Sequence, residues 1–218
     1  SCTADITVED NQAPTITCPP NDVVCATDAT GVVYTYPAVV GNDNCTFNVD
    51  QTDASGLTSS DVFPVGVTTQ EYTITETATG VTASCSFTVT VTPKPVSDFG
   101  FTPACEGEAV FFEDLSTIDA SSSITSWSWD MGDGSGPITL VDPIFSYANT
   151  GTYTVELIVE SAENCSDTSE QVIEVTPVPT AGFTVVNNCE GLATNFTNTS
   201  AISAGTLTSS WDFGDSNG

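Results

Sequence analysis

The sequence predicts an all-β fold in which small β-sandwiches follow one another along the chain. In nearly every apolar segment, apolar residues alternate with Thr, Ser or Asp, as in residues 87–91 and 153–159. This period of two belongs to strands, and the β-branched Thr and Val fit a pleated, half-buried surface. The segments are short and end at Gly, Pro, Asn or Asp, the pattern of sandwich turns, and no amphipathic helix is evident.

Internal repeats indicate a tandem array. The motif WDMGD at residues 129–133 returns as WDFGD at residues 211–215, and residues 1–8 parallel residues 84–91. Arrays of small modules usually form spacers or adhesive stalks. We therefore expect the chain to be a window of a longer array, which opens on the last strand of one module and stops within another.

Three joints that contain proline divide the chain, at residues 10–14, 92–95 and 176–179. Proline fixes φ and makes the preceding residue extended, so the joints are expected to be short and stiff, giving a linear rod. The predicted parts are the last strand of a preceding module with its linker (1–13), two complete modules (14–92 and 93–176) and the first part of another (177–218).

The charge of the chain excludes several classes of function. The 29 acidic residues face a single basic residue, Lys94, and there is no Arg or His. Nucleic-acid binding needs cations to replace phosphate counterions, and a His-assisted nucleophile or a His-ligated zinc is impossible. The excess of acid indicates either solubility and repulsion along a rod or binding of divalent cations by clustered carboxylates.

The eight cysteines predict disulfides formed in an oxidising compartment. No Cys-x-x-Cys pair occurs, which argues against zinc or a thioredoxin-like site, and no apolar run reaches the length of a membrane span. We therefore expect a secreted, cell-surface or extracellular protein.

Residues 14–92 resemble the HYR domain family, whose members are immunoglobulin-like sandwiches. The resemblance rests on PTITCP at residues 14–19, DNC at 43–45, FPVGVTT at 63–69 and CSFTVTV at 85–91, in that order. At residues 77–80 the chain departs from the family, which often has Asp before a Gly-Asn turn. No ligand is therefore expected in this turn.

Residues 93–176 resemble the PKD (polycystic kidney disease) domain, which is also a β-sandwich. The matching segments are WDMGDG at residues 129–134, PIFSY at 143–147 and GTYTV at 151–155. Residues 177–218 repeat the start of this module. Together the resemblances imply tandem immunoglobulin-like β-sandwiches, closed by disulfides.

The order of the modules suggests which cysteines pair. Cys18 lies in the opening strand and Cys85 in the closing strand of the first module, so these two are expected to bond. Two further bonds are then expected, Cys25–Cys45 and Cys105–Cys165, while Cys2 and Cys189 lack mates because the other halves of their modules are absent.

The Trp-Asp-x-Gly-Asp motif has two interpretations. Asp130 and Asp133 could chelate Ca²⁺ or act as an acid–base pair; alternatively, Trp129 fills the core while Asp and Gly shape a tight turn. The spacing differs from that of an EF-hand loop, and small sandwiches rarely supply a catalytic cleft. We favour the structural interpretation and expect no enzyme activity. The motif residues are Trp129, Asp130, Gly132 and Asp133, with Trp211, Asp212, Gly214 and Asp215.

The joint at residues 8–14 resembles the calcium-binding linkers of cadherins, in which acids and an Asn precede Ala-Pro. We expect Asp10 and Asn11 to share an ion with Asp43 and Asn44, which would stiffen the joint. The alternative is an ordinary hydrated acidic turn. No other cofactor is expected.

The families resembled here occur in very large exported proteins, including surface adhesins of gliding Bacteroidota and appendages of extracellular enzymes. The resemblance implies a non-catalytic stalk segment of a bacterial cell-surface adhesin or filament. The alternative is an accessory carbohydrate-binding region of a secreted hydrolase, for which Trp127 is expected to face away from Trp129 and stack on sugars. Expected partners are neighbouring modules, surface glycans or other copies of the chain, without nucleic acid or direct membrane insertion.

Overall fold

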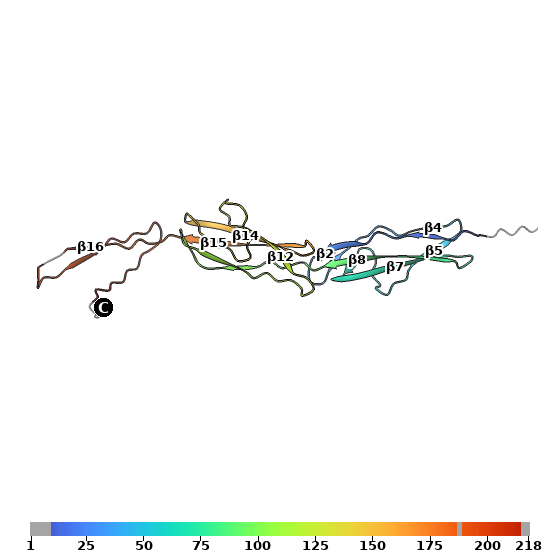
Figure 1. Ribbon diagram of the computed structural model, residues 1–218, viewed down its shortest axis with the longest axis horizontal. Coiled ribbons are helices and arrows are strands. Elements are labelled where there is room, and N and C mark those ends of the chain that lie inside the picture. The colour runs from blue at the N-terminus through green and yellow to red at the C-terminus, as the bar shows by residue number, and fades with distance from the viewer. Residues whose placement is uncertain (1–9, 187–188, 215–218) are drawn as a thin grey trace, which may run out of the picture. The chain divides into compact units, whose positions relative to one another are not determined.

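The computed structural model describes residues 10–186 and 189–214, and all regular secondary structure in that part is β-strand (Figure 1). The chain divides into two compact units. The first comprises the residues up to 96 together with residues 117–125 and 159–167, and the second comprises residues 97–116, 126–158 and those from 168 onward.

The first unit is built on a four-stranded sheet with the strand order β2-β8-β7-β5. The long strands β7 and β8 form an antiparallel hairpin, β5 pairs antiparallel with β7, and β2 pairs parallel with the end of β8. Two antiparallel pairs, β1–β4 and β3–β6, complete the sandwich. The bounds are β1 (Thr15–Thr17), β2 (Asp22–Cys25), β3 (Val32–Val33), β4 (Val40–Asn42), β5 (Phe47–Gln51), β6 (Val62–Phe63), β7 (Gly66–Glu76) and β8 (Thr82–Thr92).

Alternation along the hairpin directs one set of side chains into the core of this sandwich. Phe87, Val89 and Val91 of β8 are buried while the residues between them are not, as the period of two predicts. Phe87 packs edge-on against Tyr36 with ring centroids 5.0 Å apart, and Phe63 covers the same cluster. The core is therefore aromatic in part.

The strands of the PKD-like region form a second sandwich of the same type. One sheet has the order β10-β15-β14-β12, with β10 parallel to the end of β15, and the other has the order β13-β11-β9. Phe99, Phe112 and Trp129 form its aromatic core, closed by Met131 and Leu157. The bounds are β9 (Phe99–Phe101), β10 (Ala104–Cys105), β11 (Val110–Asp114), β12 (Ile124–Asp130), β13 (Ile144–Phe145), β14 (Gly151–Ser161) and β15 (Ser166–Thr176).

Residues 177–214 contribute one antiparallel hairpin, β16 (Phe183–Val186) with β17 (Asn195–Asn198). Its side chains are exposed, although the sequence repeats the start of the preceding module. No strands equivalent to β14 and β15 are present to cover this hairpin among the described residues.

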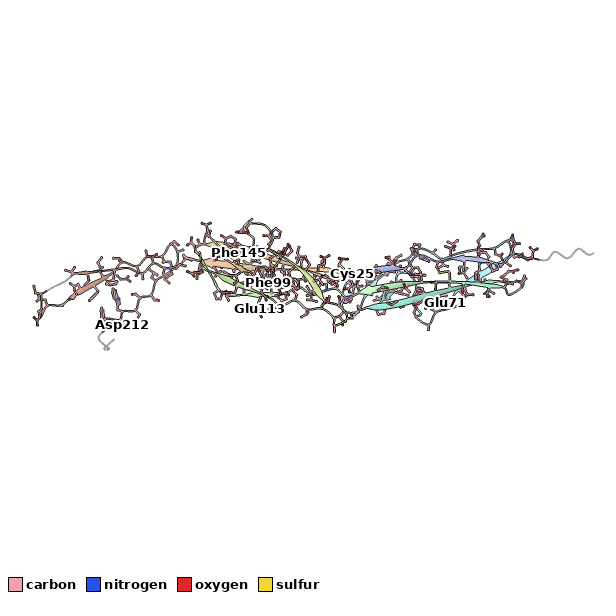
Figure 2. The ribbon with its side chains drawn as sticks, in the orientation of Figure 1. Cys25, Glu71, Phe99, Glu113, Phe145 and Asp212 are labelled. Atoms are coloured by element: carbon pink, nitrogen blue, oxygen red, sulfur yellow. A yellow bond between two sulfur atoms is a disulfide. The ribbon has the colours of Figure 1, made fainter. Side chains whose placement is uncertain are left out.

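The disulfides agree with the sequence prediction at one bond and contradict it at the other two. Cys18–Cys85 is present, as predicted. The second bond joins Cys25 to Cys165, and both residues lie within the first compact unit (Cys25 is labelled in Figure 2). Cys45, Cys105 and Cys189 are free thiols, whereas Cys2 lies outside the described residues.

The strand register explains why the predicted bonds Cys25–Cys45 and Cys105–Cys165 are wrong. Cys25 pairs with Thr92 at the end of β8, whereas Cys45 lies near the β7–β8 turn, because Phe47 pairs with Glu76. About ten residues of strand, roughly 33 Å, separate the two levels, far beyond the ~7 Å that a disulfide can span between Cα atoms. Cys105 and Cys165 lie at opposite ends of β15 in the same way.

Candidate functional site

Four turns and strand ends of the first sandwich bring an acidic cluster together. Because Thr15 pairs with Asn42, the residues before β1 run beside those that follow β4. The pairing of Phe47 with Glu76 brings the start of β5 next to the end of β7. The result is the Asp10 cluster, which we define as Asp10, Asp43, Asn44, Cys45 and Glu76.

Four side chains of this cluster, those of Asp10, Asn44, Cys45 and Glu76, lie close together. One carboxylate oxygen of Asp10, one of Glu76 and the Cys45 sulfur all lie within 4.8 Å of one another. The amide nitrogen of Asn44 donates a hydrogen bond to Asp10 Oδ1 at 3.3 Å. Two carboxylates and a thiol are thus close enough to contact a single ion.

Hydrogen bonding inside the cluster is incomplete. Within residues 10–186 and 189–214, the buried side-chain polar atoms without a hydrogen-bond partner are Asp10 Oδ2, both carboxylate oxygens of Asp43, and Glu76 Oε1. Buried polar atoms in proteins nearly always have partners, since an unpaired one loses its hydration without compensation. All four atoms belong to one acidic cluster, which marks it as unusual.

Glu76 is the most buried member of the cluster. It ends β7 and is only 1 % exposed. The turn that follows holds its backbone, with Glu76 N donating to Val81 O and Gly80 N donating to Glu76 O. The hydroxyl of Thr79 donates to Glu76 Oε2, which leaves Oε1 directed away from that bond and without a partner.

The Cys45 thiol lies beside the carboxylate of Asp10, and each group shifts the pKa of the other. The Asp10 carboxylate as a hydrogen-bond acceptor, then desolvation and the charges of Asp10, Glu76 and Asp43, raise the pKa of Cys45 to about 11. The neighbouring thiol, together with the backbone N–H of Gln12, lowers the pKa of Asp10. Both shifts follow from a negative charge held next to a donor.

No cationic side chain of the chain neutralises the cluster. The only basic residue, Lys94, forms an ion pair with Asp167, with Nζ 2.6 Å from Oδ1. The neighbouring carboxylates of Asp10 and Glu76 therefore have no cationic side chain to compensate their charge.

Of the four residues that the sequence predicted as calcium ligands, Asp10 and Asn44 are joined by a side-chain hydrogen bond. Asp43 precedes Asn44 and has two buried carboxylate oxygens without a partner, whereas Asn11 is exposed. Glu76 was missed, because we expected no ligand in the turn at residues 77–80. It lies immediately before that turn, at the end of β7.

The Trp-Asp motif forms a turn. Trp129 is fully buried and its indole N–H donates to Leu140 O, while Asp130 Oδ1 accepts from Gly132 N at 2.8 Å. Gly132 has a φ of 73°, and a Cβ there would lie 2.3 Å from the Thr154 carbonyl oxygen. The short acceptor side chain of Asp130 and the missing Cβ of Gly132 are therefore both needed for this turn.

Two further aspartates of the motif copies also accept a hydrogen bond from a backbone N–H two residues later. Asp133 Oδ1 accepts from Ser135 N at 3.0 Å, and Asp212 Oδ1 accepts from Gly214 N at 2.8 Å. In the second copy Trp211 is half-buried, and Asp215 lies outside the described residues. The side chains of Asp130, Asp133 and Asp212 thus bond to backbone amides.

Trp127 does not provide the exposed aromatic platform that the carbohydrate-binding alternative needs. It is half-buried, and its indole nitrogen donates to Asp114 Oδ2 at 2.6 Å. Residues two apart on a strand lie on the same face, so the expectation that Trp127 and Trp129 face opposite ways is wrong.

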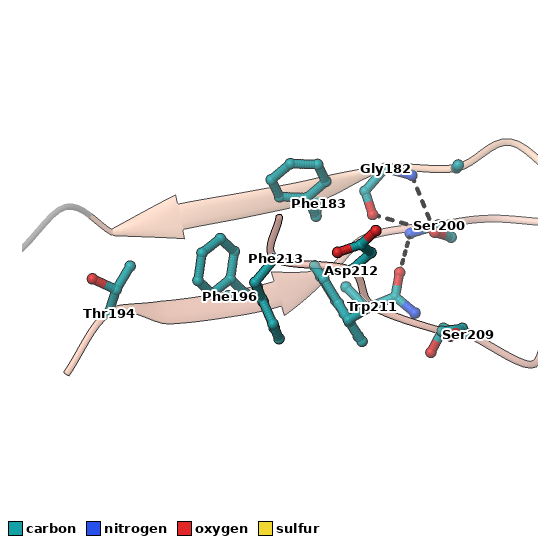
Figure 3. Close-up of a pocket in the computed structure, with 12 residues that line it drawn as sticks. Gly182, Phe183, Thr194, Phe196, Ser200, Ser209, Trp211, Asp212 and Phe213 are labelled. Carbon is teal, nitrogen blue, oxygen red and sulfur yellow. Dashed lines mark hydrogen bonds between the residues drawn. The ribbon is translucent and has the colours of Figure 1, made fainter. Parts of the chain in front are cut away.

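A hollow in residues 177–214 is lined by aromatic side chains, among them Phe183, Phe196, Trp211 and Phe213 (Figure 3). The edge-on contact between Phe183 and Trp211, with centroids 5.7 Å apart, repeats the one between Phe99 and Trp129 in the preceding module.

The difference between the two copies is burial. Phe99 is 2 % exposed and Phe183 is 60 % exposed. The hollow thus corresponds to the inner face of the preceding sandwich, left uncovered among the described residues, which explains its apolar lining without a ligand.

No helix of the described residues is long and apolar enough to cross a membrane. No curated protein matches the chain. The sequence profile of the HYR domain matches residues 9–91, and that of the PKD domain matches residues 92–177.

Three similar solved structures illustrate the range of matches. The PKD1 domain of the Vibrio cholerae metalloprotease PrtV shares 35% identity, covering 38% of this chain and 96% of that one, with a TM-score of 0.34. Carbohydrate-binding modules of the β-sandwich superfamily share 29% identity over 45% of this chain and 48% of that one, with a TM-score of 0.34. Immunoglobulin domains 1–5 of Sidekick-1 share 13% identity over 81% and 41%, with a TM-score of 0.46.

Proposed function

Because the chain contains an HYR domain followed by a PKD domain, both non-catalytic immunoglobulin-like domains typical of extracellular proteins, we propose that it is a structural segment of an exported cell-surface adhesin or extracellular filament. Its role in this proposal is mechanical: it holds a fixed length under tension. Two disulfides agree with an oxidising environment outside the cell.

The observation that carries the proposal is the Cys25–Cys165 bond. Cys25 belongs to the residues matched by the HYR profile and Cys165 to those matched by the PKD profile, 140 residues further along the chain. A bond that stabilised only one module would join residues within it, as Cys18–Cys85 does. Cys25–Cys165 ties two modules into one covalent loop.

This loop limits how far the segment can be stretched. Tension applied between residues 10 and 177 runs along the backbone to Cys25, crosses the disulfide, and continues from Cys165. That path holds about 27 residues, or roughly 95 Å when fully extended, against about 580 Å for the whole backbone. The bodies of both domains lie off this path, so unfolding them under load adds little length.

Cys105 could form a second disulfide of the same kind. It pairs with Thr176 at the end of the last PKD strand, as Cys25 pairs with Thr92, and it is a free thiol. In a longer tandem chain we propose that Cys105 is tied to the following module in the way that Cys25 is tied to Cys165.

Optical tweezers on the oxidised chain, held at its two ends, test the proposed mechanical role. With both bonds intact, the residues between Cys25 and Cys165 should release no length at any force that leaves disulfides intact. The double variant Cys25→Ser/Cys165→Ser keeps only Cys18–Cys85, so its path grows to about 100 residues and the unfolded chain gains roughly 250 Å. Full reduction should release about 490 Å.

A matched control removes the other bond. In Cys18→Ser/Cys85→Ser the shortest path still runs through Cys25–Cys165, so no gain in unfolded length is expected. Equal unfolded lengths for the oxidised chain and the Cys25→Ser/Cys165→Ser variant would refute the proposed mechanical role.

A further inference from the structure

We propose that the Asp10 cluster is a calcium site in which Asp10, Asp43 and Glu76 supply the charged ligands. The inference is independent of the mechanical role proposed above, since the site lies within the HYR domain and needs no tension. It rests on the burial of Glu76, on the oxygens that lack hydrogen-bond partners, and on the distances between the ligand atoms.

The first argument is electrostatic. Glu76 is 1 % exposed, and one of its oxygens has no partner among the described residues. Asp10 and Asp43 add further buried, unpartnered oxygens beside it. Carboxylates that lose their hydration in this way are costly unless protons or a cation compensate them, and the chain offers no cation there. A divalent cation held between Asp10 and Glu76, whose ligand atoms lie within 4.8 Å of each other, would compensate both of these groups at once.

The equivalent position in the PKD domain supports this argument. Strands β7 and β14 are each 11 residues long, begin with Gly and end on a buried polar residue, Glu76 in one and Ser161 in the other. Ser161 Oγ accepts hydrogen bonds from the backbone amides of Glu163 and Cys165 in the turn that follows. The polar residue at this position is therefore satisfied in the PKD domain, whereas Glu76 retains an oxygen without a partner.

The distances fit Ca²⁺. Calcium binds oxygen ligands at about 2.3–2.6 Å, so two oxygens on one ion lie at most about 5 Å apart. The ligand atoms of Asp10 and Glu76 fall within 4.8 Å of each other. Ca²⁺ accepts six to eight oxygens in flexible geometry, so the four unpartnered oxygens leave room for backbone carbonyls or water.

The donor set favours Ca²⁺ over a softer metal. All four unpartnered atoms are carboxylate oxygens, which are hard ligands, and the one soft atom of the cluster is the Cys45 sulfur. The thiol lies within 4.8 Å of the ligand atoms of Asp10 and Glu76. A zinc site would instead need Cys45 as a thiolate ligand, which gives the experiment a clear alternative outcome.

The ion would connect three separate parts of the HYR domain. Asp10 precedes the first strand, Asp43 follows β4, and Glu76 ends β7. A cation shared by these residues would fix the segment that enters the domain to two of its turns.

Calorimetric titration of the full chain with CaCl₂, after removal of metal with a chelator, tests the site. We expect one Ca²⁺ per chain, an affinity reduced at least about tenfold in Glu76→Gln and in Asp43→Asn, and no change in Glu71→Gln. Glu71 is exposed on the same strand and is labelled in Figure 2, which makes it a matched control. Excess Ca²⁺ should raise the melting temperature by about 10 °C and protect the amides of residues 11 and 12 from hydrogen exchange.

Without Ca²⁺, Glu76→Gln should melt no lower than the unchanged chain, because it removes one of three repelling charges. With Ca²⁺ the order should reverse, and this reversal separates a ligand from a merely structural residue. The inference is overturned if Ca²⁺ neither binds nor raises the melting temperature, or if Glu76→Gln binds as tightly as the unchanged chain. Binding of Zn²⁺ alone, lost in Cys45→Ser, would also overturn it.

Discussion

In both sandwiches a short early strand runs parallel to the end of a long last strand, β2 beside β8 and β10 beside β15. The cysteine that ends the early strand lies opposite a threonine in each case, Cys25 opposite Thr92 and Cys105 opposite Thr176. Cys25 is bonded to Cys165, and Cys105 is free. The position of a cysteine in the sandwich therefore does not decide whether it forms a disulfide. A disulfide forms where another segment brings a second thiol to the same strand end.

The interiors of the two sandwiches also differ at one equivalent buried position. Gln70 is the fifth residue of β7 and Val155 the fifth of β14, and both are fully buried. The Gln70 amide accepts from Gln51 Nε2 at 2.9 Å and donates to Ser55 Oγ at 3.0 Å. Gln51 also donates to Asp53, so the HYR domain has a polar network where the PKD domain has an apolar side chain.

The largest effect should separate the two equivalent cysteines. Because Cys18–Cys85 already shortens the loop closed by Cys25–Cys165 to about 87 residues, Cys25→Ser should lower the free energy of unfolding by about 4.5 kcal/mol. Cys105 closes no loop, and a serine in its place can keep the contact with the Thr176 hydroxyl. The free energy of unfolding of Cys105→Ser should therefore stay within about 0.5 kcal/mol of that of the unchanged chain. Urea denaturation of both variants under oxidising conditions measures the difference, and similar losses would break the comparison.

A smaller effect is expected from making the HYR interior resemble the PKD interior. Gln70→Val places the PKD residue in the HYR domain and leaves Gln51 and Ser55 without one of their hydrogen-bond partners. Stability should fall by about 1–3 kcal/mol, the range for buried polar groups that lose a partner. An unchanged urea midpoint would mean that the network contributes nothing and that the two interiors are interchangeable here.

The smallest effect concerns acid. Burial works against the charge of Asp53, but hydrogen bonds from Ser55, Glu71 N and Gln51 outweigh it and lower the pKa to about 2 from an ordinary 3.8. A lowered pKa means that Asp53 stabilises the fold fully above pH 4, and that this contribution is lost as the pH falls towards 2. After solvent screening it amounts to about 1 kcal/mol.

Asp53→Asn should therefore flatten the decline of stability between pH 4 and pH 2. Asp50→Asn, an exposed change on the neighbouring strand β5, should leave the decline unchanged. Melting temperatures measured across this pH range for the two variants test the assignment, and parallel curves would contradict it.

Much of the fold could be predicted from the sequence, because alternation and turn residues are local signals. The period of two in residues 87–91 predicted the buried Phe87, Val89 and Val91, and the order of cysteines predicted Cys18–Cys85. The parallel first strands were not predicted, since register is not visible in local pattern. The other two pairings failed because we assumed that each bond closes within its own module, and strand register separates those cysteines.

The candidate site was likewise predicted in part, and the rest of it depended on tertiary structure. Asp10, Asp43 and Asn44 were predicted from a resemblance between linkers, and strand pairing brings them together. Glu76 was missed because the turn after it lacks the Asp of the related family, although a carboxylate one position earlier was a usable signal. Asn11 is exposed, and its exposure could not be predicted because the direction of a linker side chain depends on tertiary contacts.

The most direct test of the central claim is peptide mapping of the oxidised chain by mass spectrometry without reduction. The account predicts a cross-linked peptide that joins Cys25 to Cys165, a second that joins Cys18 to Cys85, and thiol labelling of Cys45 and Cys105. Peptides that join Cys25 to Cys45 and Cys105 to Cys165 would contradict it, because each domain would then be closed separately and nothing covalent beyond the backbone would tie the two domains together.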